Sequence, residues 1–320
     1  MSYAVETYQL TKTVGLFNKI NIIDKLNLKV EQGRIFGLLG PNGAGKSTFF
    51  KLLLGLMKIT SGKAFLFGEK VPSPLSRKKV GFLPETMNHY EYMNIGEYLR
   101  YYASLQSMGR VQEKISDALK VMGMRGHDGI ELGICSKGMK QRVDLARLLM
   151  MDAELILMDE PVSGLDPQGQ IELKEILLAM KKKGCSIVLN SHAVGILSEL
   201  CDDIGIMQNG QLRLIGNLSV LLKTREVCVL IQAENSRKLD NLLKESDLKI
   251  ARYEKRTENR CELFIQGQLD LTQHLVKVIA QGVCIIHAKP LRKTLEQLFI
   301  ETANGTGTEE NLLENSGIKK

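Results

Sequence analysis

The 320-residue sequence has few cysteines and no long apolar run. Its six cysteines stand far apart with no C-x-x-C pair, which excludes a zinc or dithiol site of that spacing and indicates reduced cytosolic thiols rather than a disulfide framework. No apolar stretch approaches the roughly 18 residues of a membrane-spanning helix. The first six residues lack the basic and apolar segments of a secretory signal. We therefore expect that any action at a membrane depends on another chain for the span.

Charge of one sign is only slightly in excess. Lys and Arg number 43 against 36 Asp and Glu, which gives +7 and a pI near 9.0. This balance would suit nucleic acid, an anionic membrane surface or a nucleotide. The basic residues are scattered, however, and the densest runs, 77–79 and 181–183, resemble a solvated face. We expect no nucleic-acid partner.

The order of apolar runs predicts a parallel α/β domain over residues 1–220. Residues 20–30 alternate between apolar and polar, as a half-buried strand does, and residues 35–39 form a short apolar run typical of a strand buried on both faces. A glycine-rich loop and a helix-like run at 49–54 follow, as in a parallel α/β unit. Helical spacing predicts a helical subdomain over about 90–150. Two more buried strands and a hairpin are predicted at 155–158, 186–190 and 204–215.

Beyond about residue 220 the pattern predicts a second, smaller α+β domain over 221–302. Strands are predicted at 227–231, 248–253, 261–265 and 283–287, and helices at 237–245 and 271–280. The order β-α-β-β-α-β is that of a split β-α-β, ferredoxin-like unit. A last amphipathic helix is predicted over 291–302. The polar tail 303–320 is predicted to be disordered.

The segment between the strand at 35–39 and the following helix satisfies the P-loop pattern G-x-x-x-x-G-K-[ST]. It consists of Gly40, Pro41, Asn42, Gly43, Ala44, Gly45, Lys46, Ser47 and Thr48. The glycines allow consecutive N–H groups to surround a β-phosphate. Lys46 is placed to reach the β- and γ-phosphates, Ser47 to put its hydroxyl on Mg²⁺, and the helix N-terminus adds positive potential. The alternative, a glycine turn without a ligand, does not explain this strand-loop-helix setting.

Two adjacent acids end the apolar strand at 155–158. A carboxylate at a strand end beside a P-loop is suited to hold Mg²⁺, usually through water, which is the predicted role of Asp159. Glu160 follows directly, where a general base could polarise the attacking water. The alternative is that the two acids cap Pro161 and a turn.

An ordered set of short motifs identifies one family. It comprises Cys135-Ser136-Lys137-Gly138-Met139-Lys140-Gln141-Arg142, Asp159-Glu160, Ser163-Gly164-Leu165-Asp166 and Ser191-His192. With the P-loop, this set resembles the nucleotide-binding subunit of an ABC transporter over about residues 5 to 220. The resemblance implies a RecA-like P-loop NTPase core with an antiparallel β edge and a helical subdomain. It also implies ATP and Mg²⁺ as cofactors, and a dimer of two heads that sandwiches two ATP molecules.

In that family the signature segment, commonly L-S-G-G-Q, closes over the γ-phosphate held by the opposite subunit. The resemblance therefore implies a trans site formed by Ser136, Lys137, Gly138 and Met139. The start of a helix suits this role, because hydroxyl, amide and helix dipole all face an anion. Only Ser136 and Gly138 match the common form, and the S-K-G-M-K-Q-R variant resembles drug, lipid and peptide exporters. An ordinary capped helix would explain Ser136 alone.

Four more roles come from the resemblance. Glu85 stands at the family's Q-loop glutamine, which implies an acid that orients Mg²⁺ or water and links the site to the helical subdomain; the alternative is a solvated loop acid. His192 corresponds to the switch histidine that contacts the γ-phosphate, at a strand end where α/β ligands bind. Asp166 resembles the D-loop aspartate that crosses the dimer interface. The family stacks adenine on an aromatic upstream of the P-loop, often in a Y-G pair, where Val14-Gly15 would give valine. Counting back from Gly33 instead favours Phe17 for this role, against an ordinary core phenylalanine.

These implications predict the ATPase subunit of an ABC exporter at the cytoplasmic face of the cell membrane. Its partners would be a separate transmembrane permease subunit and a second nucleotide-binding subunit, identical or not. ATP binding would close the dimer, and hydrolysis assisted by Glu160 would open it. The accessory domain, which carries none of the motifs, would support dimer contact or regulation. The sequence leaves the cargo open.

Two alternatives belong to other classes of protein. A soluble ABC ATPase acting on DNA would need a long coiled coil between P-loop and signature, yet Lys46 and Ser136 are only 90 residues apart. One acting on the ribosome would carry two heads, and this sequence has one P-loop. The other alternative is a non-hydrolysing regulatory module. The presence of Lys46 together with Asp159, Glu160 and His192 argues against it.

Overall fold

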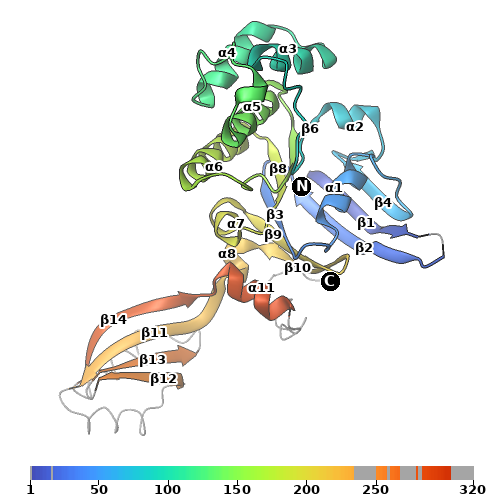
Figure 1. The fold of residues 1–320 in the computed structure, drawn as a ribbon. Coiled ribbons are helices and arrows are strands. Elements are labelled where there is room, and N and C mark those ends of the chain that lie inside the picture. Colours follow the sequence, from blue (N-terminus) through green and yellow to red (C-terminus); the bar gives the residue numbers. More distant parts are fainter. Residues whose placement is uncertain are drawn as a thin grey trace. The chain divides into compact units, whose positions relative to one another are not determined.

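The computed structural model describes residues 2–15, 17–233, 250–257, 260–266, 279 and 283–303. The chain divides into two compact units, Met1–Leu218 with Phe299–Lys320, and Ser219–Leu298 (Figure 1). Within the described ranges, no helix combines the length and the apolarity needed to cross a membrane.

A six-stranded sheet forms the centre of the first unit, in the order β10-β9-β3-β8-β7-β6 (Figure 1). The five strands from β9 to β6 are parallel neighbours, and β10 pairs antiparallel with β9. This sheet confirms the predicted α/β core. Because parallel strands end at the same edge, the loops after β3, β7 and β8 meet there. The strands are β3 (Ile35–Leu39), β6 (Val80–Leu83), β7 (Leu155–Asp159), β8 (Ser186–Asn190), β9 (Asp203–Gln208) and β10 (Gln211–Asn217).

A four-stranded antiparallel sheet, β2-β1-β4-β5, supplies the predicted antiparallel edge. Its strands are β1 (Tyr3–Val14), β2 (Ile20–Glu31), β4 (Ser61–Leu66) and β5 (Glu69–Lys70). The alternation predicted for 20–30 is confirmed, since Leu26, Leu28 and Val30 are buried and the residues between them are exposed. Helix α1 (Lys46–Leu53) contacts strands of both sheets, and its Phe49 and Phe50 belong to the same buried core as β2.

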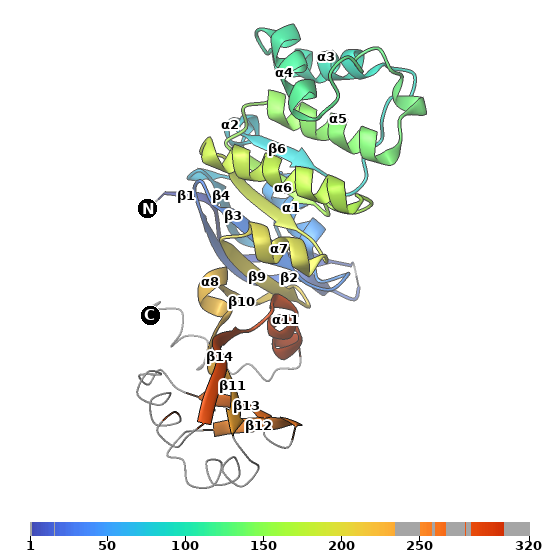
Figure 2. The ribbon, with the colours of Figure 1, turned by 90° about the vertical axis from the view of Figure 1, so that its left-hand side faces the viewer.

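The predicted helical subdomain contains three α-helices, α3 (Ile95–Leu105), α4 (Val111–Val121) and α5 (Lys137–Met150), with a 3₁₀ turn at Leu132–Ile134. Figure 2 shows them grouped at one end of the first unit. Helix α3 begins with a capping box between Asn94 and Glu97. A break separates α3 from α4, and Ser107 and Arg110 in this break have left-handed backbones. The other helices that lie wholly in this unit are α2 (Pro74–Lys78), α6 (Pro167–Lys182) and α7 (Val194–Leu200), and α8 (Leu218–Leu221) begins at the end of this unit and continues into the second.

Buried polar side chains connect α3 and α5 with the loop after β6. The hydroxyl of Tyr98 donates to Asp144 Oδ1 at 2.9 Å, and His89 Nε2 lies 3.0 Å from Asp144 Oδ2. The side chains of His89 and Asp144 are only 8% and 5% exposed. Burial, and then the charge of Asp144, raise the pKa of Tyr98, which keeps its hydroxyl proton as a donor. Asp144 therefore satisfies two buried partners from separate segments.

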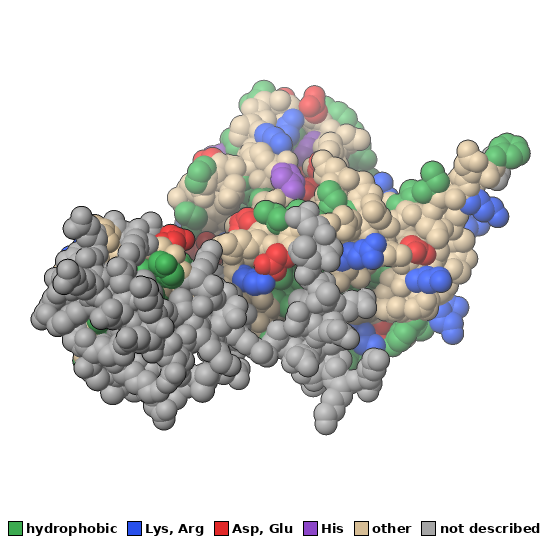
Figure 3. Space-filling model, turned by 90° about the horizontal axis from the view of Figure 1, so that it is seen from below, with side chains coloured by type: hydrophobic (Ala, Val, Ile, Leu, Met, Phe, Trp, Pro, Cys, Tyr) green, Lys and Arg blue, Asp and Glu red, His purple; other side chains and the backbone are tan. Residues whose placement is uncertain are grey.

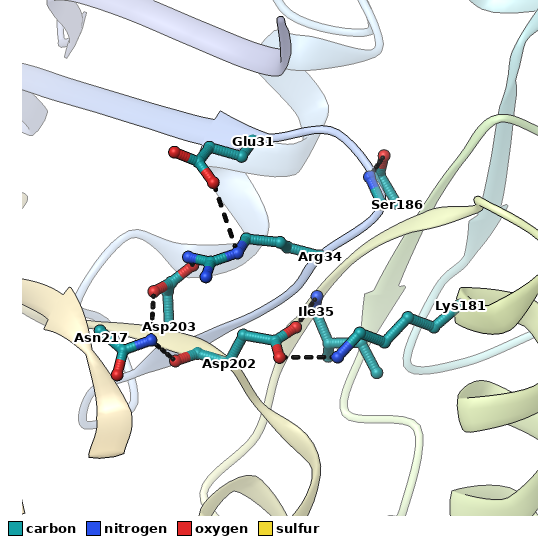
Figure 4. A network of polar contacts seen from close by, with 9 residues as sticks. Glu31, Arg34, Ile35, Lys181, Ser186, Asp202, Asp203 and Asn217 are labelled. Atoms are coloured by element: carbon teal, nitrogen blue, oxygen red, sulfur yellow. Dashed lines mark hydrogen bonds and ion pairs between the residues drawn. The ribbon is translucent and has the colours of Figure 1, made fainter. Parts of the chain in front are cut away.

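A second polar network lies at the amino ends of the parallel strands (Figure 4). Arg34 pairs with Asp203 at 2.6 Å, and Lys181 with Asp202 at 2.6 Å. Asn217 Nδ2 donates to Asp203 Oδ1 at 3.3 Å and to the carbonyl of Asp202 at 3.0 Å. These contacts join β3, α6, β9 and β10 at the edge opposite the P-loop.

The second unit contains the four predicted strands, with shifted ends. They are β11 (Lys223–Ala233), β12 (Ile250–Thr257), β13 (Arg260–Gln266) and β14 (Val283–Arg292). Their order is β12-β13-β11-β14 and all neighbours are antiparallel, an order that a split β-α-β unit has. The predicted helix 237–245, and 271–280 apart from residue 279, lie outside the described residues, so the ferredoxin-like topology stays a prediction.

The last helix, α11, runs from Leu295 to Ala303. It begins four residues later than predicted, because residues 291 and 292 continue strand β14. Ala303, predicted to begin the tail, still belongs to the helix. The rest of the predicted tail, 304–320, lies outside the described residues.

Replacing Asp144 by alanine should lower the free energy of unfolding. The change leaves the Tyr98 hydroxyl and the His89 ring buried without their partner, and each such group costs about 1–3 kcal/mol. Chemical denaturation of the full chain measures the effect. Asp117→Ala on the exposed face of α4 is the control and should stay within about 0.5 kcal/mol of wild type. Equal stability of the two variants would contradict a stabilising role for this network.

Candidate functional site

The loop between β3 and α1 packs directly against neighbouring backbone. Gly45 caps α1 in a left-handed conformation with φ 105°, and a Cβ there would lie 2.7 Å from the carbonyl oxygen of Ile22. A Cβ on Gly40 would lie 2.4 Å from the carbonyl oxygen of Met207. Both positions therefore require glycine. The crest of the loop, residues 41–43, is exposed, so its backbone N–H groups are open to an incoming anion.

Lys46, the first residue of α1, is 7% exposed. Its ammonium group donates to two carbonyl oxygens of the loop, at 2.6 and 3.1 Å. Burial lowers the pKa of Lys46, and the charges of Glu160, Asp159 and Glu85 act in the opposite direction. Three acids from distant parts of the sequence are thus within electrostatic reach of this ammonium group.

Asp159 ends β7 and is 7% exposed. Its register partner on β8 is Asn190, whose Nδ2 donates to Asp159 Oδ1 at 2.7 Å. Asn190 also accepts the backbone N–H of Glu160, with Oδ1 at 2.9 Å and with its own carbonyl oxygen at 3.2 Å. None of the sequence motifs assigns a role to Asn190. The available signal is an amide at the end of an apolar strand, directly before Ser191-His192.

Glu160 has a left-handed backbone with φ 50° and a side chain that is 9% exposed. Its Oε2 lies 2.8 Å from His192 Nδ1, and it accepts from the His192 N–H and the Ser191 hydroxyl at 3.3 Å each. The His192 side chain is 68% exposed. A carboxylate held by several donors beside an accessible imidazole can take a proton from a water molecule in front of it.

The residues predicted to hold Mg²⁺ offer oxygen atoms, which Mg²⁺ prefers. Ser47 lies in the first turn of α1, Asp159 at the end of β7, and Glu85 in the loop after β6, where it is exposed. Nowhere in the described part of the chain do three or more His, Cys, Asp or Glu side chains form a metal-binding group of their own. The donor set fits Mg²⁺ that also binds phosphate oxygens and water, which is how this ion usually binds.

The signature segment forms the first turn of α5. Ser136 is its N-cap, and the hydroxyl oxygen accepts the N–H of Met139 at 3.2 Å. Lys137 lies over the backbone of Gly164, where a Cβ would be 2.3 Å from its Nζ. A Cβ on Gly138 would meet no atom within 4 Å, so its backbone is open to approach. Contact of this turn with a nucleotide on a second subunit stays a prediction.

Asp166 and Phe17 have contrasting surroundings. Asp166 is the N-cap of α6, and its Oδ1 accepts the N–H of Gly169 at 2.9 Å. Phe17 is 97% exposed in the loop between β1 and β2, so the alternative of an ordinary core phenylalanine is wrong. Adenine stacking by Phe17 and the crossing of a dimer interface by Asp166 stay predictions.

The candidate site lies on an open edge of the sheet. A cavity of about 430 Å³ lies between α4, α5 and α6, and its lining, which includes the Arg142–Glu172 ion pair, contains none of the predicted site residues.

On the face seen in Figure 3, Lys and Arg side chains stand singly or in small groups, as the scattered basic residues of the sequence predict.

Comparisons with known proteins indicate one family for this chain. A family model described as ABC transporter matches residues 23–163. The chain is 36% identical to an uncharacterized ABC transporter ATP-binding protein of Nostoc, over 88% of the chain and 83% of that protein. It is 36% identical to a similar Synechocystis protein over 69% of the chain, but spans only 65% of that relative's length. It is also 36% identical to the bacitracin transport ATP-binding protein BcrA of Enterococcus faecalis, over 70% of the chain and 72% of BcrA.

A solved structure described as the ATP-binding subunit of an ABC transporter has the same fold. It is 28% identical, with a TM-score of 0.63, over 68% of this chain and 91% of that one. A dimeric ATP-binding cassette bound to ADP and phosphate, 22% identical with a TM-score of 0.62, shares the fold over 67% of this chain and 98% of its own.

Alanine at Gly45 should destabilise the protein more than alanine at Gly43. Both glycines have a left-handed backbone, but a Cβ at Gly43 meets no atom within 4 Å, whereas one at Gly45 meets three within 3 Å. Overpacking of this kind costs about 1–3 kcal/mol in addition to the backbone strain that both variants share. Thermal unfolding of the two variants isolates the crowding. Equal melting temperatures would show that the loop can move away from β2.

Proposed function

Because the chain belongs to the ABC transporter family of ATP-binding proteins, we propose that it hydrolyses ATP as the ATPase subunit of an ABC exporter. The observation that carries this proposal is the Glu160 carboxylate, held by Ser191 and His192 within electrostatic reach of the P-loop lysine. The P-loop, which would hold the nucleotide, and Glu160, which would accept a proton, thus lie at one edge of the sheet. A protein that only binds ATP would not need a proton acceptor there.

Each group has a part in the hydrolysis. The crest N–H groups of the P-loop and Lys46 hold the phosphates. Ser47, Asp159 and Glu85 would hold Mg²⁺, which when bound neutralises phosphate charge. Glu160 accepts a proton from the attacking water, while the N–H of His192 and the hydroxyl of Ser191 fix the orientation of the carboxylate. The exposed part of the His192 ring is left to contact the γ-phosphate.

The second half of each ATP site comes from another subunit in this proposal. Ser136 to Met139 would close over the γ-phosphate held by the partner's P-loop, Asp166 would contact the partner across the interface, and Phe17 would stack on adenine. The exposure of Phe17 and the open space at Gly138 support these roles. By population arithmetic, ATP must favour the closed dimer by roughly 5.5 kcal/mol for a nearly complete switch.

The transport role connects this head to a membrane. We propose a position at the cytoplasmic face of the cell membrane, where a separate permease subunit supplies the span and binds the cargo. The similarity to BcrA, a bacitracin transport ATP-binding protein, supports a transporter over a DNA- or ribosome-linked ATPase. The S-K-G-M form of the signature supports an exporter.

Glu160→Gln should retain ATP binding and lose turnover, because the amide keeps the shape but cannot accept a proton. Loss of general-base assistance costs roughly 10²- to 10⁴-fold. Phosphate release and ATP titration are measured together on the purified protein. Glu113→Gln, on the exposed side of α4, should behave as wild type, and Lys46→Ala should instead weaken ATP binding. A Glu160→Gln turnover within twofold of wild type would remove Glu160 from this role.

We propose that residues 221–302, which the second compact unit covers as far as Leu298, form an accessory domain that supports dimer contact or regulation and not catalysis. Every site residue proposed above, from Phe17 to His192, precedes it. A chain cut after residue 222 should therefore bind ATP with about the affinity of the full protein, with weaker dimerisation or altered turnover. ATP titration and thermal unfolding with Mg-ATP measure this. If the shortened chain neither folds nor binds nucleotide, residues beyond 222 are part of the ATP-binding head.

A further inference from the structure

Asn190 lies between the two acids of the candidate site and contacts both. Its amide nitrogen donates to Asp159 Oδ1 at 2.7 Å, and its amide oxygen accepts the Glu160 N–H at 2.9 Å. We propose that Asn190 is a positioning residue for the hydrolysis proposed above, on which this inference rests. Its carboxamide sets the orientation of the Asp159 carboxylate and holds the backbone of Glu160.

Burial makes this arrangement specific. Asn190 has no exposed surface, and it ends a strand whose other members are also buried. A buried amide is costly unless both its donor and its acceptor are used. In the described part of the chain, Asn190 is the one side chain that donates to the Asp159 carboxylate. The carboxylate is therefore held by a single directional contact on a rigid strand, which leaves the second oxygen available to a metal-bound water.

The contact with Glu160 has a different purpose. Glu160 has φ 50°, a conformation that side chains other than glycine adopt reluctantly. Its N–H points at two oxygen atoms of Asn190, the amide oxygen at 2.9 Å and the carbonyl oxygen at 3.2 Å. This turn brings the Glu160 side chain back toward Ser191 and His192. Without Asn190 Oδ1, the backbone would lose one of the contacts that hold it in this conformation.

The three consecutive residues 190–192 thus hold different parts of the two acids. Asn190 holds the metal-side acid and the backbone of the proton-accepting acid, while Ser191 and His192 hold the carboxylate of the latter. A change at Asn190 should therefore affect both the Mg²⁺ dependence of nucleotide binding and turnover. Binding by the P-loop without Mg²⁺ should be unaffected, because the hydrogen bonds of Lys46 in the described part of the chain go to the loop carbonyls of Gly40 and Pro41 and not to Asn190.

Asn217 offers a matched control. Its amide nitrogen also donates to an aspartate, Asp203 Oδ1 at 3.3 Å, but at the opposite edge of the same sheet (Figure 4). The test compares Asn190→Leu with Asn217→Leu, since leucine keeps the branching of the side chain and removes both the donor and the acceptor. Asn190→Ser and Asn217→Ser form a second, smaller pair in case leucine prevents folding. Each protein is measured as the full chain.

Three quantities are measured: thermal unfolding, ATP affinity with Mg²⁺ and with EDTA, and phosphate release. We expect Asn190→Leu to keep the affinity in EDTA, to lose most of the gain that Mg²⁺ gives, and to lose turnover by roughly 10- to 100-fold, as for partners of metal ligands. Asn217→Leu should keep the wild-type ATP affinity with Mg²⁺, the wild-type affinity in EDTA and the wild-type rate of phosphate release, whatever its melting temperature.

The inference is overturned if Asn190→Leu, or Asn190→Ser where leucine does not fold, stays within twofold of wild type in both Mg²⁺ gain and turnover. It is also overturned if the Asn217 variants lose as much, since the effect would then follow from stability alone. Wild-type protein that binds ATP but releases no phosphate would instead refute the proposed function. In that case the Mg²⁺ gain in affinity decides only whether Asn190 positions the Asp159 carboxylate for the metal.

Discussion

The parallel pairing of β7, β8 and β3 is the constraint on which the candidate site depends. In the strand register, Asn190 of β8 lies between Asp159 of β7 and Leu38 of β3. The P-loop and the acid pair therefore begin at the same level of the sheet. The hydrogen bonds between strand ends, rather than loop conformation alone, set the separation between the P-loop and the Asp159–Glu160 pair.

Close packing imposes a second constraint at the same edge. Gly40 and Gly45 let the loop lie against the carbonyl oxygens of Met207 and Ile22, one from the central sheet and one from the antiparallel sheet. Both sheets therefore limit where the backbone of the loop can lie. Rigid elements position functional groups more accurately than free loops do.

Much of this architecture could be predicted from sequence because the strands that matter are short, apolar and buried on both faces. Strand β1 could not, since register shifts between Thr7 and Leu10 and the left-handed backbone of Gln9 break its alternation. The contacts of Asn190 could not be predicted from the sequence for another reason. The partners of an amide depend on which residue of β7 lies opposite, and no local pattern near residue 190 contains that pairing.

Ser136 and Asp166 show that a side chain can cap a helix in its own chain and still keep a hydrogen-bonding site for a second subunit. The Ser136 hydroxyl oxygen accepts the N–H of Met139 through a lone pair, which leaves its own proton to donate to an anion. Asp166 uses Oδ1 to cap α6, and a carboxylate has further acceptor sites on its other oxygen. Capping thus fixes each side chain at a helix start while it keeps a free hydrogen-bonding site. A helix cap in one chain is then compatible with a contact to a second chain, because the cap uses only part of the hydrogen-bonding capacity of the group.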